Sequence, residues 1–183
     1  AQATSITIDN STPTVGTAPG LTITAVGDNT ATSMTFTGAG TTTATGALST
    51  GLTTITGSAA TGALDLNISS NTNNLTMTLG SGDDRVEAGT VGTNLTADDT
   101  WDLGTGTNTL AINDTSLTAG DITNIKSVTG VSVLEFTTTT AESTYDANAI
   151  GTLNTFVLSG AITDAAGAAA AAAAACLQCR VQN

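Results

Sequence analysis

Two short segments of similar layout, 24 residues apart, carry the side chains in this chain that are best suited to bind an ion. Residues 79–86 and 103–110 both read apolar-Gly-x-Gly-x-(Asp or Asn)-x-apolar. Glycines two residues apart allow positive φ angles and can turn their carbonyl oxygens toward one point. The Asp or Asn adds a side-chain oxygen, and hard cations such as Ca²⁺ bind oxygen ligands. The spacing therefore predicts a Ca²⁺ site at each segment.

The predicted metal ligands are backbone and side-chain oxygens in or just before these two segments. They belong to Gly80, Gly82, Asp83, Asp84, Asp102, Gly104, Gly106 and Asn108. Asp84 supplies a carboxylate to the first site, whereas Asn108 supplies a neutral amide oxygen to the second. The alternative is that both segments are ordinary glycine turns in which the Asx side chains cap their own backbone.

The composition predicts an all-β fold. Only 10% of the 183 residues are charged, against roughly 25% in an average globular protein. Thr supplies 42 residues and Gly another 20. Thr is β-branched and favours extended backbone, and Gly favours turns, so many short strands with solvent-facing Thr are expected.

The charge distribution excludes several classes of function. The net charge is −12, and eleven of the 15 acidic residues lie between positions 83 and 146. Such a surface repels nucleic acids and anionic membranes, which bind basic patches. The chain has no His, which removes the commonest general base and every Ser-His or Cys-His pair. We therefore expect neither an enzyme nor a nucleic-acid-binding protein.

Short apolar segments recur in two interleaved series. One series begins at residues 64, 86, 110, 133 and 156, and the other at residues 53, 77 and 101. Two strand series that share one period predict a parallel β-solenoid with coils of about 24 residues, because each coil then gives a strand to each face. A β-sandwich is the alternative, since its turns also recur with rough regularity.

Composition divides the chain into three parts. Residues 1–62 form a Thr/Gly-rich β segment, residues 63–160 hold the solenoid repeats, and residues 161–183 form an Ala-rich tail whose identity is left open. Residues 114–130 depart from the repeat and could hold a helical turn or a longer loop, capped by Ser116 or Asp114. In the tail, Cys176 and Cys179 favour a local disulfide over redox catalysis.

The segment at residues 80–86 resembles the nonapeptide of RTX proteins, Gly-Gly-x-Gly-x-Asp-x-apolar-x, but lacks its first Gly. Residues 104–110 are similar, with Asn108 in place of Asp. The run from residue 102 to residue 136 resembles repeats of secreted bacterial surface-layer proteins, and the whole resemblance covers roughly residues 63–160. It implies a secreted, calcium-dependent β-solenoid that assembles into a lattice or filament. In this chain, however, the motif recurs only every 24 residues, whereas RTX nonapeptides are contiguous.

These features together predict a structural, extracellular protein at the cell surface. Its expected partners are copies of itself and cell-surface glycans, with Ca²⁺ as the bound ion. Five Asn-x-Ser/Thr sequons are consistent with a glycoprotein, at Asn10, Asn67, Asn74, Asn94 and Asn113. No membrane span is expected, because the longest apolar-looking run, residues 161–175, is mostly Ala. The alternative function is a secreted adhesin or glycan-binding module.

Overall fold

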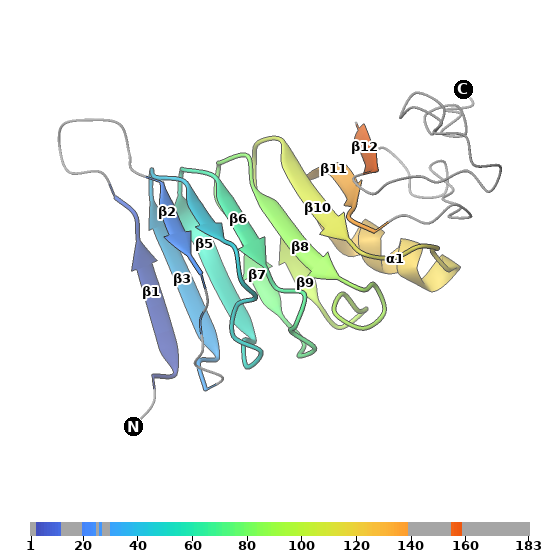
Figure 1. The fold of residues 1–183 in the computed structure, drawn as a ribbon, viewed down its shortest axis with the longest axis horizontal. Coiled ribbons are helices and arrows are strands. Elements are labelled where there is room, and N and C mark those ends of the chain that lie inside the picture. Colours follow the sequence, from blue (N-terminus) through green and yellow to red (C-terminus); the bar gives the residue numbers. More distant parts are fainter. Residues whose placement is uncertain (1–2, 12–19, 25, 27–29, 139–154, 159–183) are drawn as a thin grey trace.

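The computed structural model describes residues 3–11, 20–24, 26, 30–138 and 155–158. Two parallel sheets wind into a β-solenoid of about 5 turns with about 23 residues per turn (Figure 1). The predicted all-β solenoid and its period are therefore confirmed. The β-sandwich alternative is wrong, because every pair of neighbouring strands in these sheets is parallel and sandwich sheets are antiparallel.

Each complete coil contributes one strand to each sheet. Sheet A contains, in order, β1 (Ser5–Asp9), β3 (Ser33–Gly38), β5 (Thr54–Ala60), β7 (Thr76–Thr78) and β9 (Thr100–Asp102). Sheet B contains, in order, β12 (Thr155–Leu158), β11 (Val131–Phe136), β10 (Asn108–Ile112), β8 (Arg85–Gly89), β6 (Leu64–Asn67), β4 (Thr42–Ala44) and β2 (Leu21–Ile23). The compositionally distinct segment 1–62 thus supplies β1 to β5 of the same two sheets.

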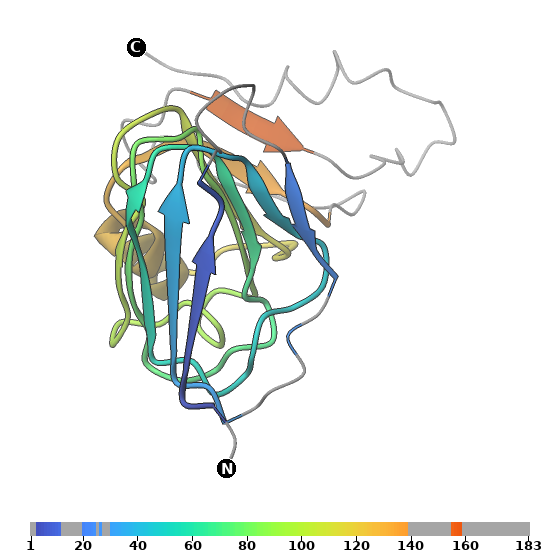
Figure 2. The same ribbon diagram turned by 90° about the vertical axis from the view of Figure 1, so that its left-hand side faces the viewer.

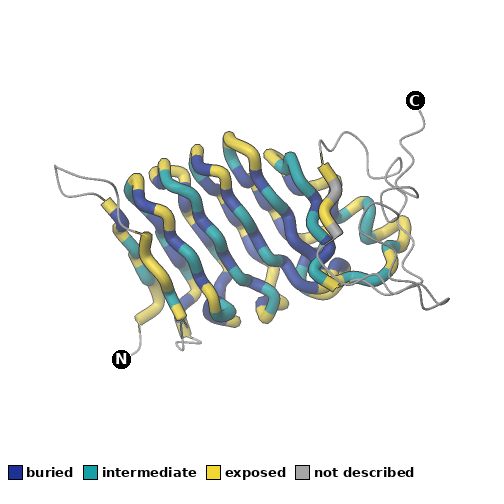
Figure 3. The backbone as a smooth tube through the Cα atoms, turned by 45° about the horizontal axis from the view of Figure 1, so that its top comes forward, coloured by how far each residue is buried: buried dark blue, intermediate teal, exposed yellow. Residues whose placement is uncertain are grey.

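The core lies between the two sheets and consists of a stack of apolar side chains. Figure 2 shows the two sheets facing each other, and Figure 3 shows buried positions recurring along the successive strands. In sheet A, Met34, Ile55, Met77 and Trp101 are register neighbours on successive strands, and each is at most 2% exposed. Leu66, Val86, Leu110 and Leu134 form the equivalent column in sheet B. Because each coil buries its apolar residues only against neighbouring coils, the fold is nearly one-dimensional.

One helix lies in the described part of the chain, α1 (Ala119–Ser127), and it interrupts the repeat after β10. Its N-cap is Thr118, which forms a capping box with Asp121, so neither Ser116 nor Asp114 is the cap. Its Ile125 is buried. The chain then returns at Thr129, whose N–H donates to the Trp101 carbonyl at 3.0 Å and whose carbonyl accepts from the Leu103 N–H. The residues around Thr129 therefore occupy the edge of β9 that faces away from β7.

In the part of the chain that the structure describes, no helix is both long and apolar enough to cross a membrane.

Candidate functional site

The two glycine segments form stacked corners of the solenoid, each leading into a strand of sheet B. We name residues 79–84 the first corner, before β8, and residues 103–108 the second corner, at the start of β10. The Thr105 N–H donates to the Gly80 carbonyl at 3.0 Å, and the Thr107 N–H donates to Asp83 Oδ1 at 2.7 Å. Hydrogen bonds along the solenoid axis therefore join the two corners directly.

The glycines allow the coils to approach closely at these corners. A Cβ atom on Gly80 would lie 1.8 Å from the Ala60 carbonyl oxygen, and one on Gly104 would lie 2.0 Å from the Gly80 carbonyl oxygen. Gly104 and Gly106 also have positive φ, of 74° and 119°. Gly80 and Gly82 are not among the glycines with positive φ. The expected positive φ is therefore found only in the second corner, and the first corner needs glycine for space alone.

A column of stacked glycines explains the second Gly of each motif. A Cβ on Gly106, Gly82 or Gly62 would lie 2.3, 2.6 or 2.4 Å from the carbonyl oxygen of the Gly one coil earlier, and that column ends at Gly40. The sequence signal for this column was the recurrence of Gly at residues 40, 62, 82 and 106. Sequence reasoning assigned only the last two of these positions, and assigned them to ion binding.

Asp84 lies inside the first corner and is 1% exposed. Its Oδ1 accepts from the Leu64 N–H of the preceding coil at 2.8 Å, and its own N–H donates to Asn108 Oδ1 of the following coil at 2.9 Å. Within the described residues, Asp84 Oδ2 is buried without a hydrogen-bond partner. Asp84 therefore links three successive coils and leaves one carboxylate oxygen unsatisfied.

Asn108 occupies the same position one coil later and is fully buried. Its Oδ1 accepts from Asp84, while its amide nitrogen donates to the carbonyls of Leu103 at 2.9 Å and Gly130 at 3.0 Å. Both ends of the amide are satisfied. Asp84 and Asn108, which the sequence predicted as ligands of two separate ion sites, are thus consecutive members of one buried column.

Burial raises the pKa of Asp84 from 3.8 to about 6. The negative charge of neighbouring Asp83 raises this pKa further, whereas the N–H groups of Leu64 and, more weakly, Gly80 lower it. The corner therefore disfavours the ionised carboxylate, which is the form that a divalent cation needs.

Several of the other predicted ligand oxygens already accept backbone hydrogen bonds. The Gly80 carbonyl accepts from Thr105, Asp83 Oδ1 from Thr107 and Asp102 Oδ1 from Gly104 at 3.0 Å. Among the described residues, no group of three or more His, Cys, Asp or Glu side chains is arranged to hold a metal ion. Calcium binding stays a prediction from the motif.

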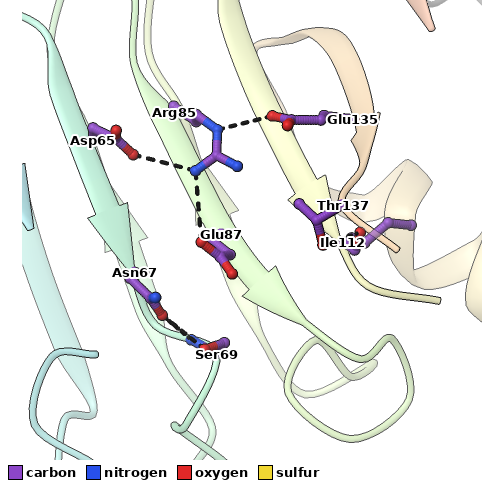
Figure 4. Close-up of polar contacts among 8 residues, drawn as sticks. All are labelled: Asp65, Asn67, Ser69, Arg85, Glu87, Ile112, Glu135 and Thr137. Carbon is purple, nitrogen blue, oxygen red and sulfur yellow. Dashed lines mark hydrogen bonds and ion pairs between the residues drawn. The ribbon is translucent and has the colours of Figure 1, made fainter. Parts of the chain in front are cut away.

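Sequence reasoning missed an ion-pair cluster on the outer face of sheet B (Figure 4). Arg85 Nε lies 2.8 Å from Glu135 Oε2, and its Nη1 lies 3.3 Å from Asp65 Oδ1 and 3.7 Å from Glu87 Oε2. These residues come from β6, β8 and β11, so only the register of the sheet brings them together. Arg85 thereby connects coils that are 50 residues apart in sequence.

Comparisons of the chain with protein families, with curated proteins and with solved structures found no match. The likeness to RTX and surface-layer proteins therefore rests on the motifs alone. The predicted Cys176–Cys179 disulfide and the rest of the tail lie outside the described residues.

Proposed function

We propose that this chain is a structural extracellular protein that assembles with copies of itself through the edge that β1 forms in the described structure. The supporting observation is a difference between the ends of sheet A. The edge of β9 is occupied by the Thr129 segment. Within the described residues, β1 pairs with β3 alone, and β2 pairs with β4 alone.

The first coil is also incompletely buried. Ile6 and Ile8 face the core but are only half-buried, whereas their register partners Met34 and Phe36 are 0% and 1% exposed. An edge with unpaired N–H and C=O groups and half-covered apolar side chains is a template for another strand. A strand of a second copy would satisfy these groups and cover both isoleucines.

The charge distribution favours a second copy at this end. Residues 1–62 carry only Asp9 and Asp28 of the 15 acidic residues. Two chains of net charge −12 repel each other least where their N-terminal coils meet. The low Lys content and the absence of Cys before residue 176 fit an extracellular protein.

The test is the size of the purified chain in solution, measured by light scattering and by electron microscopy with and without a chelator. Ile6→Lys places a charge in the open edge, which blocks strand addition. We expect wild type to form dimers or larger assemblies and Ile6→Lys to remain monomeric. Loss of the assemblies in chelator would support the predicted role of Ca²⁺.

Thr43→Lys is the matched control, because it adds the same charge to the outer face of β4, away from the β1 edge. It should assemble like wild type, and circular dichroism should show both variants folded. A wild-type chain that is monomeric at all accessible concentrations would contradict the proposal and favour the binding-module alternative. Assembly lost in Thr43→Lys but kept in Ile6→Lys would place the contact on sheet B instead.

A further inference from the structure

The outward side chains of sheet A form a regular grid of hydroxyl groups. Outward positions alternate with the buried core column along each strand, and the register aligns them from strand to strand. One column is Ser5, Ser33, Thr54, Thr76 and Thr100, and the other is Thr7, Thr35, Thr56, Thr78 and Asp102. Nine of these ten side chains are Ser or Thr.

The backbone fixes the spacing of this grid in both directions. Neighbours within a column are one strand spacing apart, about 4.8 Å, and the columns are two residues apart, about 6.6 Å. The side chains between the columns, such as Met34, Ile55 and Met77, are at most 1% exposed. The backbone that carries the grid therefore packs on its other face against the core, which restricts its motion.

The hydroxyl groups of the grid are not used by the protein itself. In the part of the chain that the structure describes, none of the nine makes a side-chain hydrogen bond to another protein atom. The neighbouring Thr32 and Thr53, which lie just before the strands, instead donate to backbone carbonyls. Five grid threonines are exposed and can present the hydroxyl to solvent, whereas Thr35 and Thr54 are partly buried. The exposed ones are Thr7, Thr56, Thr76, Thr78 and Thr100.

The chemistry of the grid excludes several occupants. Asp102, at one end, is its only charged residue, and it has no aromatic side chain on which a sugar or base could stack. A stable protein interface uses about 20–30 residues per side, so ten small side chains are too few for a second copy. An array of hydroxyl groups with two fixed repeats and a single charge at one end suits a crystalline surface that offers hydrogen-bonding groups at matching intervals.

We propose that the outer face of sheet A binds ice. The oxygen atoms of ice form planes whose two repeats are on the scale of the two grid spacings, and each water can both donate to and accept from a Thr hydroxyl. The Thr methyl groups would add apolar contact beside these hydroxyl anchors. This binding does not depend on the proposed self-assembly, because it uses a face and not the β1 edge.

The test uses a solution of the chain of residues 1–183. It measures the gap between the melting and freezing temperatures of a single ice crystal in that solution, and the retention of the protein on an ice surface. Thr56→Tyr places a bulky ring in the middle of the grid at an exposed position. Thr43→Tyr makes the same change on the outer face of β4 in sheet B and is the matched control. We expect a gap in wild type and in Thr43→Tyr, and loss of most of it in Thr56→Tyr.

The proposal is overturned if wild type shows neither a gap nor retention on ice. It is also overturned if the two variants lose activity equally while circular dichroism shows both folded. Binding to crystalline chitin or cellulose that Thr56→Tyr abolishes, without any ice activity, would assign the face to a polysaccharide. A dimer that Thr56→Tyr alone dissociates would assign it to a second copy.

Discussion

The first and second corners are near copies in sequence, and they differ in how well they satisfy the same buried position. Asn108 accepts through Oδ1 and donates to the carbonyls of Leu103 and Gly130. Asp84 accepts in the same way from Leu64 but leaves Oδ2 without a partner in the described structure. The position therefore suits a side chain that both donates and accepts, which Asn is and an ionised Asp is not.

The largest effect is expected from Gly104→Ala, because it tests the close approach that both corners share. The new Cβ would lie 2.0 Å from the Gly80 carbonyl oxygen, at a residue with φ of 74°. We expect a loss of more than about 4 kcal/mol in the free energy of unfolding, from strain and separation of the coils, measured by urea denaturation. Gly120→Ala is the control, because a Cβ on Gly120 would lie 3.6 Å from the nearest atom outside its own helix backbone, which is ordinary contact. Equal losses of stability in the two variants would show that the close approach of the coils does not require glycine at position 104.

Removing the buried amide of Asn108 should lower the free energy of unfolding almost as much as Gly104→Ala does. Asn108→Ala leaves the Asp84 N–H and the Leu103 and Gly130 carbonyls without their partner in a buried site. The expected loss is about 3 to 4 kcal/mol, again from denaturation midpoints. Asn73→Ala removes an exposed amide that donates to the Thr50 carbonyl at 2.7 Å and should cost less than about 1 kcal/mol. A similar loss of stability in both variants would show that the buried amide of the corner contributes no more than an exposed one.

The fold was predictable because its signal is repeated. The apolar columns of Met77 and Trp101 in sheet A and of Val86 and Leu110 in sheet B recur at the solenoid period, so their spacing alone indicated parallel stacking. The two corners were predictable as glycine turns. The hydrogen bonds that their Asp and Asn side chains make were not predictable. Whether the Asp84 oxygens face an ion or the neighbouring N–H groups depends on the register between coils, which a single sequence does not show.

The Arg85 cluster was hidden for the same reason. Its partners Asp65 and Glu135 lie 20 and 50 residues away in sequence, and only the strand order β6, β8, β10, β11 aligns them. The grid of Thr54, Thr76 and their neighbours was suggested only as solvent-facing Thr, because its two-dimensional regularity also depends on register.

The next largest effect is on the pH dependence of stability, to which Asp84 contributes and Asn108 does not. The folded pKa, about 6, is above the unfolded value of 3.8. The neutral form is therefore favoured by folding, and stability falls as pH rises from about 4 to above 6, by up to about 3 kcal/mol. Asp84→Asn should be more stable than wild type at pH 8 and should lose this part of the pH dependence, as measured by urea denaturation at several pH values.

Asp98→Asn is the charge-matched control for this measurement, because Asp98 is exposed. It removes the same charge without touching the corner, so its pH profile should run parallel to that of wild type. If Asp84→Asn is less stable than wild type at pH 8, then the ionised carboxylate has a favourable partner. Added Ca²⁺ that stabilises wild type but not Asp84→Asn would identify that partner as the ion predicted from the motif.

The smallest effect is expected at Asp83, where the second corner has Thr107 instead. Asp83→Asn keeps a side-chain oxygen that can accept from the Thr107 N–H, so stability at pH 8 should change by less than about 0.5 kcal/mol. Because the charge of Asp83 raises the pKa of Asp84, the pH transition should move to lower pH. Carbon NMR of the Asp84 carboxyl group in wild type and variant would measure this shift directly. An unchanged midpoint would mean that burial alone, and not the second acidic residue, distinguishes the first corner from the second.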